Sequence, residues 1–293
     1  MPGGQCDPSG QHPIRRRSPL GAAAGAALGW IGYETPARAD QVLPGFPDVS
    51  LRRDRYRNWD QTISVSSVWT AVPTKRSEIL VVCDWAVEHD YRVRVRGHQH
   101  SWAPWTITDD QEQAEQVVLL DLRDRFTDVA MIADDRVRVQ AGATVESLLA
   151  HLDDHDRGIA ACPAPGQITV AGAVAINGHG TAVPADGEER SPGMRFGSMS
   201  NLIVAVTVVT WDEVKGGFGI TELERDSAEI APYLTLLGRG VIIDLTLQAG
   251  AKEHFHCRNR TDIGVSTLFA HPDKAGSDSL AALVDRYGRV GLI

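Results

Sequence analysis

The residues best suited to chemistry form a short turn, Arg96-Gly97-His98-Gln99-His100-Ser101, directly after an alternating apolar segment. A tight turn of this composition directs consecutive backbone N–H groups into one concavity, which can bind a pyrophosphate without any lysine. His100 would lie at the rim of the concavity. The turn therefore predicts a site for a phosphate-bearing ligand.

Two other interpretations of the turn are open. His98 and His100 would share a face if the strand continued through them, and His179 is the best candidate for a third ligand of a metal such as zinc. Alternatively, both are ordinary surface histidines. No Cys-x-x-Cys pair indicates zinc or a dithiol site among the 4 cysteines.

A second segment rich in small residues covers 163–173 (Pro-Ala-Pro-Gly-Gln-Ile-Thr-Val-Ala-Gly-Ala) and continues to Asn177-Gly178-His179-Gly180. Glycine and alanine allow a planar ligand to lie against the main chain, and the same composition also suits a close helix–sheet contact. Two shorter segments of this kind follow, Gly197-Ser198-Met199-Ser200-Asn201 and Gly238-Arg239-Gly240-Val241-Ile242. Each of the four segments follows or precedes a predicted strand.

Apolar periodicity predicts the elements that position these segments. Helices are expected over about 75–89, capped by Thr74 and with Cys83 on its apolar face, and from Thr144 to beyond Leu152. Strands are expected at 91–96, 117–122, 136–141, 201–210, 240–247 and 288–293, with an extended arm at 40–57. The strands at 201–210 and 240–247 are apolar throughout, which is typical of burial on both faces. The mixture predicts an α+β fold.

Composition and absent motifs exclude several functions. Of 293 residues, 43% are hydrophobic and 23% charged, as in soluble globular proteins. The net charge of −9 argues against nucleic-acid binding. No strand leads into Gly-x-Gly-x-x-Gly, and neither a P-loop nor a Gly-x-Ser-x-Gly nucleophile elbow occurs.

Residues 1–39 differ in composition from the rest. Three arginines at 15–17 precede an apolar run at 20–31, and Ala37-Arg38-Ala39 forms a small-x-small site. This order predicts a secretory signal, and adjacent arginines favour the twin-arginine route to the periplasm or exterior. The run is too short to span a bilayer. A leader without an export role is the alternative.

The four segments, in this order, resemble the FAD-binding domain of the vanillyl-alcohol oxidase / p-cresol methylhydroxylase (PCMH-type) family. Within it they are similar to the flavin-linked (type II) cholesterol oxidases, which have an Arg-Gly-x-x-His turn, a Pro-Ala-Pro-Gly loop running into Asn-x-His-Gly, and Gly-Ser-x-Ser-Asn-Leu. Tyr56-Arg57-Asn58-Trp59 and Cys257 also match. The resemblance covers about residues 41–293.

The resemblance implies FAD as cofactor, and a covalent bond from His100 to the flavin 8α-methyl group. A neutral imidazole nitrogen is a suitable nucleophile for that bond. Cys162 is assigned to structure, and Cys257 to a buried strand. Cofactor contacts are implied for Arg96, Gly97, His98, Gln99, His100, Ser101, Pro165, Gly166, Ile168, Thr169, Gly172, Asn177, Gly178, His179, Ser200, Asn201 and Ile242. No metal is implied.

The same resemblance implies a domain order and an activity. A signal peptide (1–39) would precede the PCMH-type FAD-binding domain (40–248), made of two α+β subdomains, and 249–293 would begin a truncated substrate domain. The activity would be oxidation of an alcohol, sterol-like, with O2 as acceptor and hydrogen peroxide as product. A sugar or lactone oxidase, or a non-catalytic FAD-binding fragment, are the alternatives. Because family members are much longer and hold their catalytic residues further on, no catalytic base is assigned.

Overall fold

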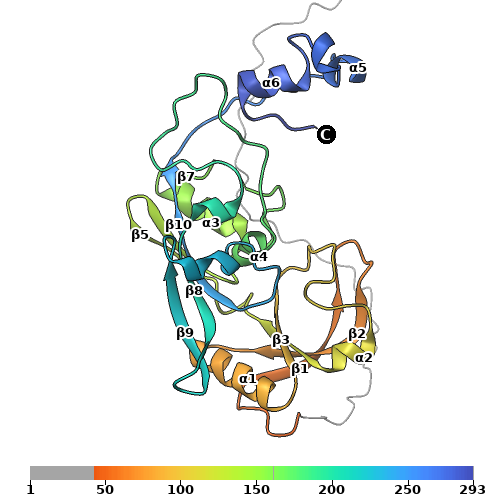
Figure 1. Cartoon of the computed structure of the whole chain (residues 1–293), viewed down its shortest axis with the longest axis vertical. Helices are drawn as coiled ribbons and strands as arrows, with labels where there is room; N and C mark the ends of the chain where they lie inside the picture. The colour runs from red at the N-terminus through yellow and green to blue at the C-terminus, as the bar shows by residue number, and fades with distance from the viewer. Residues whose placement is uncertain (1–42, 161, 293) are drawn as a thin grey trace, which may run out of the picture. The chain divides into compact units, whose positions relative to one another are not determined.

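The computed structural model describes residues 43–160 and 162–292, so the predicted signal peptide at 1–39 lies outside the described residues. Two main β-sheets with flanking helices form the described part of the chain (Figure 1). This arrangement confirms the predicted α+β class.

The first sheet has the order β1-β2-β4-β3. Its strands are β1 (Ser50–Arg57), β2 (Ser64–Val72), β4 (Val117–Asp121) and β3 (Arg92–Arg96). β1 runs antiparallel to β2, whereas β2 and β3 both run parallel to β4. The parallel pairing requires a crossover between β2 and β3, and helix α1 (Arg76–Glu88) provides it; α2 (Gln111–Glu115) precedes β4.

The second sheet is antiparallel throughout, in the order β5-β6-β10-β8-β9. Its strands are β5 (Val129–Ala133), β6 (Arg136–Gln140), β10 (Ile242–Gln248), β8 (Ile203–Asp212) and β9 (Gly217–Glu224). Helices α3 (Val145–Asp154) and α4 (Val170–Ala175) follow β6 along the chain, and the strand β7 (Arg157–Gly158) pairs with β11 (Gly250–Ala251).

A continuous apolar core joins the two sheets. It contains Ile79 and Val82 of α1, Leu148 of α3, and Val206 and Leu245 at the centre of the second sheet. Strand β4 is buried on both faces, since side chains alternate along a strand: Val118 and Leu120 belong to this core, and Val117 and Leu119 to a second cluster with Tyr56.

Most predicted elements are present, with shifts of a few residues at their ends, and β8 and β10 are buried as expected. Three local predictions were wrong. Residues 50–57 form strand β1, paired within the first sheet, rather than an extended arm. Thr74 does not cap α1: its N–H and hydroxyl donate to the Glu78 carboxylate, and Lys75 occupies the cap position.

The third wrong prediction concerns the last residues. Instead of a strand at 288–293, helix α6 (Leu280–Tyr287) ends at Gly288, whose φ is +66°, and Arg289 forms a single bridge with Ala182. The Arg289 guanidinium pairs with Glu188 and Glu253. Between β11 and α6 lie two short turns of helix, α5 (Val265–Leu268) and η3 (Pro272–Lys274).

The cysteines are unpaired in the described part of the chain. Cys83 is buried on the apolar face of α1 as predicted, whereas Cys257 is exposed and lies outside any strand, which corrects the expected buried position. No helix within 43–160 and 162–292 has both the length and the apolar character needed to cross a membrane.

Candidate functional site

A pocket with about 910 Å³ of empty space, part of it open to solvent, lies at the end of strand β3. Backbone segments that are far apart in the sequence form its wall: the turn after β3, the ends of β4 and β6, helix α4 with the loop before it, and the loop before β10. It is lined by Tyr56, Val95 to Ser101, Trp105, Thr106, Leu122, Ala141, Gly142, Ile168, Thr169, Ala171 to Ala173, Ala175, Ile176, Leu236 to Gly238, Gly240 and Ile242.

Ten of the predicted cofactor residues meet in this pocket. They are Arg96, Gly97, His98, Gln99, His100, Ser101, Ile168, Thr169, Gly172 and Ile242. They come from three of the four small-residue segments recognised in the sequence. The structure therefore brings the turn, the second segment and the fourth segment to one place, although these segments span nearly 150 residues of chain.

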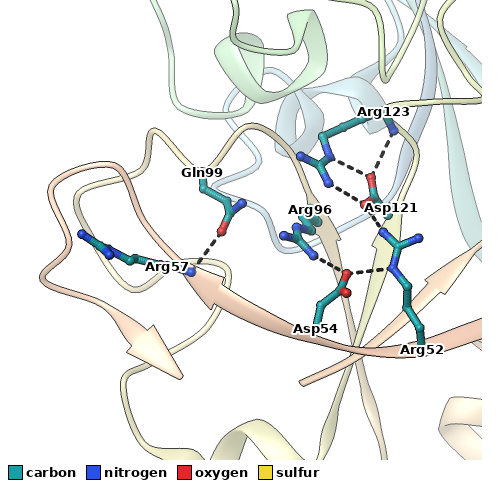
Figure 2. Close-up of polar contacts among 7 residues, drawn as sticks. All are labelled: Arg52, Asp54, Arg57, Arg96, Gln99, Asp121 and Arg123. Carbon is teal, nitrogen blue, oxygen red and sulfur yellow. Dashed lines mark hydrogen bonds and ion pairs between the residues drawn. The ribbon is translucent and has the colours of Figure 1, made fainter. Parts of the chain in front are cut away.

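The turn after β3 is held by the loop between β1 and β2. Gln99 has a φ of +63°, in the left-handed region that non-glycine residues rarely adopt. Its side-chain oxygen accepts a hydrogen bond from the Arg57 N–H at 3.1 Å (Figure 2). Its carbonyl accepts one from the Trp59 N–H at 2.8 Å. The Asn58 amide donates to the Ser101 carbonyl at 3.0 Å. These bonds offset the strain at Gln99 and fix the direction of the turn.

Beside the turn lie four ion pairs, two of which connect different strands of the first sheet (Figure 2). Asp54 of β1 accepts from Arg96 at 2.7 Å and from Arg52 at 2.9 Å. Asp121, at the end of β4, accepts from Arg52 at 3.3 Å and from Arg123 at 2.6 Å. Three guanidinium groups therefore face two carboxylates. Asp124 adds a third carboxylate near Arg123 and His98, so the charged groups balance in number beside the turn.

Burial and these charges shift three pKa values at the site. Burial raises the pKa of the Tyr56 phenol. Burial and the nearby Arg123 charge lower the pKa of His98, which keeps its imidazole neutral at neutral pH. Burial would raise the pKa of Asp121, but the hydrogen bonds and charge of Arg123 outweigh that effect and lower it.

Helix α4 presents its N-terminus to the pocket through a side-chain cap. The Thr169 hydroxyl accepts a hydrogen bond from the Gly172 N–H at 3.2 Å. A Cβ at Gly172 would lie 2.7 Å from that hydroxyl, and one at Gly97 would lie 3.0 Å from it. Close packing against Thr169 therefore requires both glycines, and all three residues line the pocket.

The other seven predicted contacts lie outside the pocket wall: Pro165, Gly166, Asn177, Gly178, His179, Ser200 and Asn201. Two of them, Gly178 and His179, bond to residues of the segment 197–201. The Gly178 carbonyl accepts from the Met199 N–H at 2.8 Å, and His179 bridges Ser198. A Cβ at Gly178 would lie 2.8 Å from both Pro163 and the Ala173 carbonyl, so close packing requires this glycine.

Ser200 and Asn201 have local roles in the structure. The buried Ser200 hydroxyl donates to the Leu234 carbonyl, and the Asn201 amide donates to the Phe196 carbonyl at 3.0 Å. Their proposed contacts with a cofactor stay predictions. Across 43–160 and 162–292, no three His, Cys, Asp or Glu side chains come close enough to hold a metal, so the alternative of a metal site at His98, His100 and His179 has no support from the geometry.

Sequence reasoning missed several residues of the pocket wall, notably Tyr56, Trp105 and Thr106. Tyr56 lies in β1, and it is 2% exposed. The Tyr56-Arg57-Asn58-Trp59 motif was a signal for it. The loop at 236–240 was recognised only from its glycines; the Leu237 N–H donates to the Ala175 carbonyl at 2.8 Å, which fixes this loop against α4.

Comparison with known proteins identifies the fold. A family model described as an FAD binding domain matches residues 69–213. A solvent-stable cholesterol oxidase superposes with a TM-score of 0.80 at 36% identity over 84% of this chain, and the cholesterol oxidase of Brevibacterium sterolicum with 0.77 at 33% over 84%. The chain belongs to the PCMH-type FAD-binding family. The predicted family and fold are confirmed.

The match covers 46% of each of these two structures, so the chain spans about half the length of the relatives it matches. A variant of the Brevibacterium sterolicum enzyme matches similarly, with a TM-score of 0.75. No curated protein sequence matches the chain.

The residues of the pocket fit the cofactor of this family. FAD carries an anionic diphosphate, and the guanidinium of Arg96 belongs to the pocket wall. Arg96 is 9% exposed, and its Nε is buried with no hydrogen-bond partner among the described residues. A bound anion would satisfy this group, because buried polar atoms without partners are costly.

Proposed function

We propose that this pocket binds FAD and that the chain is an FAD-dependent oxidoreductase that acts on an alcohol. The observation that carries the proposal is the convergence of ten predicted cofactor residues on one pocket in a PCMH-type FAD-binding domain. When bound, FAD would supply the hydride-accepting chemistry.

Different residues of the pocket would bind different parts of FAD. The backbone of the turn from Gly97 to Ser101 and the buried Arg96 guanidinium would hold the diphosphate, with Thr169 and Gly172 shaping the opposite wall. Neutral imidazole is the nucleophilic form of histidine. As the family resemblance implies, His100 would form a covalent bond to the flavin 8α-methyl carbon in place of one of its C–H bonds, with two protons and two electrons passing to O2.

The substrate is proposed from the similarity to the two cholesterol oxidases: a sterol-like alcohol, with O2 as acceptor and hydrogen peroxide as product. A sugar or lactone oxidase is the alternative within the same chemistry. We also propose export by the twin-arginine route, on the basis of the pattern at residues 1–39.

A second candidate function is FAD binding without turnover. The described residues of the pocket wall include no Asp, Glu or Lys, so Tyr56, His98 and His100 are its only side chains that commonly transfer protons. This composition suits a binding site better than a complete catalytic site.

The first experiment compares flavin fluorescence of the purified chain and of His100→Ala after denaturing electrophoresis. A fluorescent band that disappears in the variant supports a covalent histidyl flavin. A dark band from a yellow native protein indicates non-covalent FAD, and a colourless native protein contradicts the proposal that the pocket binds FAD.

The second experiment measures hydrogen peroxide from the flavin-loaded chain with cholesterol and with an oligosaccharide. Peroxide from cholesterol supports the leading proposal, and peroxide from the oligosaccharide alone supports the alternative. Peroxide from neither substrate, in a chain that holds flavin, supports binding without turnover.

A further inference from the structure

Trp59 stacks on the ring of His100, a residue of the pocket wall. Their ring centroids are 5.8 Å apart and their planes differ by 20°. Trp102 stacks on Trp59 in the same way, at 5.9 Å and 18°. Distances and angles of this kind are typical of offset aromatic stacking, which stabilises one ring orientation beyond simple burial.

Trp59 is 59% exposed and Trp102 is 67% exposed. A large exposed aromatic side chain gains little from burial in the core, so core packing does not explain Trp59. Its main described side-chain contacts are the two stacked rings.

The backbone beside Trp59 is fixed to the same turn. The Trp59 N–H donates to the Gln99 carbonyl at 2.8 Å, directly before His100 in the chain. Asn58 is 2% exposed, and its amide donates to the Ser101 carbonyl at 3.0 Å, directly after His100. The Asn58 side-chain oxygen accepts from the Ile63 N–H at 2.9 Å, which keeps its amide oriented. The residues on both sides of His100 are therefore anchored by the segment that carries Trp59.

We propose that Trp59 is a positioning residue for His100: it holds the imidazole plane in the orientation from which a ring nitrogen can reach the flavin in the pocket. Asn58 and the Trp59 N–H fix the backbone on both sides of His100, and the indole ring of Trp59 fixes the His100 imidazole. This inference rests on the proposed function for its consequence, the covalent bond, but the orientation itself is a property of the chain alone.

The test uses the full chain as purified, treated with diethyl pyrocarbonate and digested for mass spectrometry. The peptide with His100 reports two quantities: the share that carries flavin, and the rate at which the remainder is carbethoxylated. Trp59→Leu removes the aromatic face and keeps an apolar side chain, while Trp59→Phe keeps an aromatic face. Trp211→Ala is the matched control, since Trp211 is a 44% exposed tryptophan of strand β8 in the other sheet.

In Trp59→Leu we expect the flavin share at His100 to fall and its carbethoxylation rate to rise by about two- to tenfold, the range that one aromatic pair provides. Trp59→Phe should stay near wild type, and Trp211→Ala should equal it. Equal rates and shares in Trp59→Leu and wild type would overturn the inference.

The two readouts separate this inference from the proposed function. A wild-type chain without flavin at His100 contradicts the covalent bond, and the carbethoxylation rates then decide the positioning role alone. Thermal unfolding of each variant shows whether it folds. If Trp59→Leu does not fold, Trp59→Met takes its place, with the same expected result and the same result that would overturn the inference.

Discussion

The guanidinium of Arg96 lies 2.7 Å from the carboxylate of Asp54, at the point where strand β3 ends and the turn of the pocket begins. The pair joins β1 to β3 across a sheet in which the two strands occupy opposite edges. Asp54 also accepts from Arg52. Arg96 donates to Asp54 through Nη1, and its buried Nε has no hydrogen-bond partner among the described residues. The same side chain thus connects the sheet and contributes a donor to the pocket.

Arg96→Met should weaken both the fold and flavin binding. The variant removes one partner of a largely buried ion pair, which costs about 1–3 kcal/mol of unfolding free energy. It also removes a positive charge beside the pocket, so flavin affinity should fall. Urea unfolding and flavin titration measure the two effects. Arg260→Met is the control, because Arg260 pairs with Asp262 at the exposed surface. A flavin affinity of Arg96→Met equal to that of the wild type would contradict the role of Arg96 in the site.

Thr169→Val should destabilise helix α4 by about 0.5–2 kcal/mol, since it removes the cap that accepts from the Gly172 N–H. The pocket wall formed by this helix should become less ordered, and flavin affinity should fall with it. Thr169→Ser keeps the hydroxyl and should retain most of both properties. Equal unfolding midpoints for the Val and Ser variants would show that the cap contributes little.

The sequence predicted the residues of the site better than it predicted their arrangement. Local rules suffice for the turn at 96–101, because its glycine and polar residues follow directly from strand β3. They do not predict that Tyr56 reaches the pocket, since that depends on the pairing of β1 with β2 and on the place of β2 beside β4. The extended arm expected at 40–57 was wrong over 50–57 for the same reason: the charged residues of β1 look solvated until the ion pairs are known.

The segments at 177–180 and 197–201 show a different limit of prediction from the sequence. Both are rich in small residues, which indicated a ligand, yet both lie outside the pocket wall and bond to each other. Close packing of backbone against backbone needs small residues as much as a planar ligand does. Composition alone cannot distinguish the two uses.

Stability should depend on pH through Asp121. Its pKa is lowered in the folded chain, so its contribution to stability is present above the unfolded value of 3.8 and is lost as pH falls through the folded value. Asp121→Asn should therefore be less stable than wild type at pH 7, and the difference should shrink below a pH of about 4. Chemical unfolding at a series of pH values measures it; a difference that stays constant down to pH 3 would contradict the assignment.

The thiols of Cys83 and Cys257 should react at very different rates. Burial on α1, with the neighbouring Asp84 charge, raises the pKa of Cys83 to about 12, so almost none of it is thiolate at pH 8. Cys257 is exposed in a segment without regular structure. Iodoacetamide at pH 8 should label Cys257 in the folded chain and Cys83 only after unfolding, with Cys257→Ser as the control.

The same experiment decides between two positions for Cys257. The family resemblance implied a buried strand, whereas the structure places this thiol at the surface. Peptide mapping after labelling assigns each modified cysteine. Rapid labelling of Cys257 supports the exposed position. If Cys257 were protected from labelling as strongly as Cys83, the thiol would be buried in solution. That result would support the buried position that the family resemblance implied.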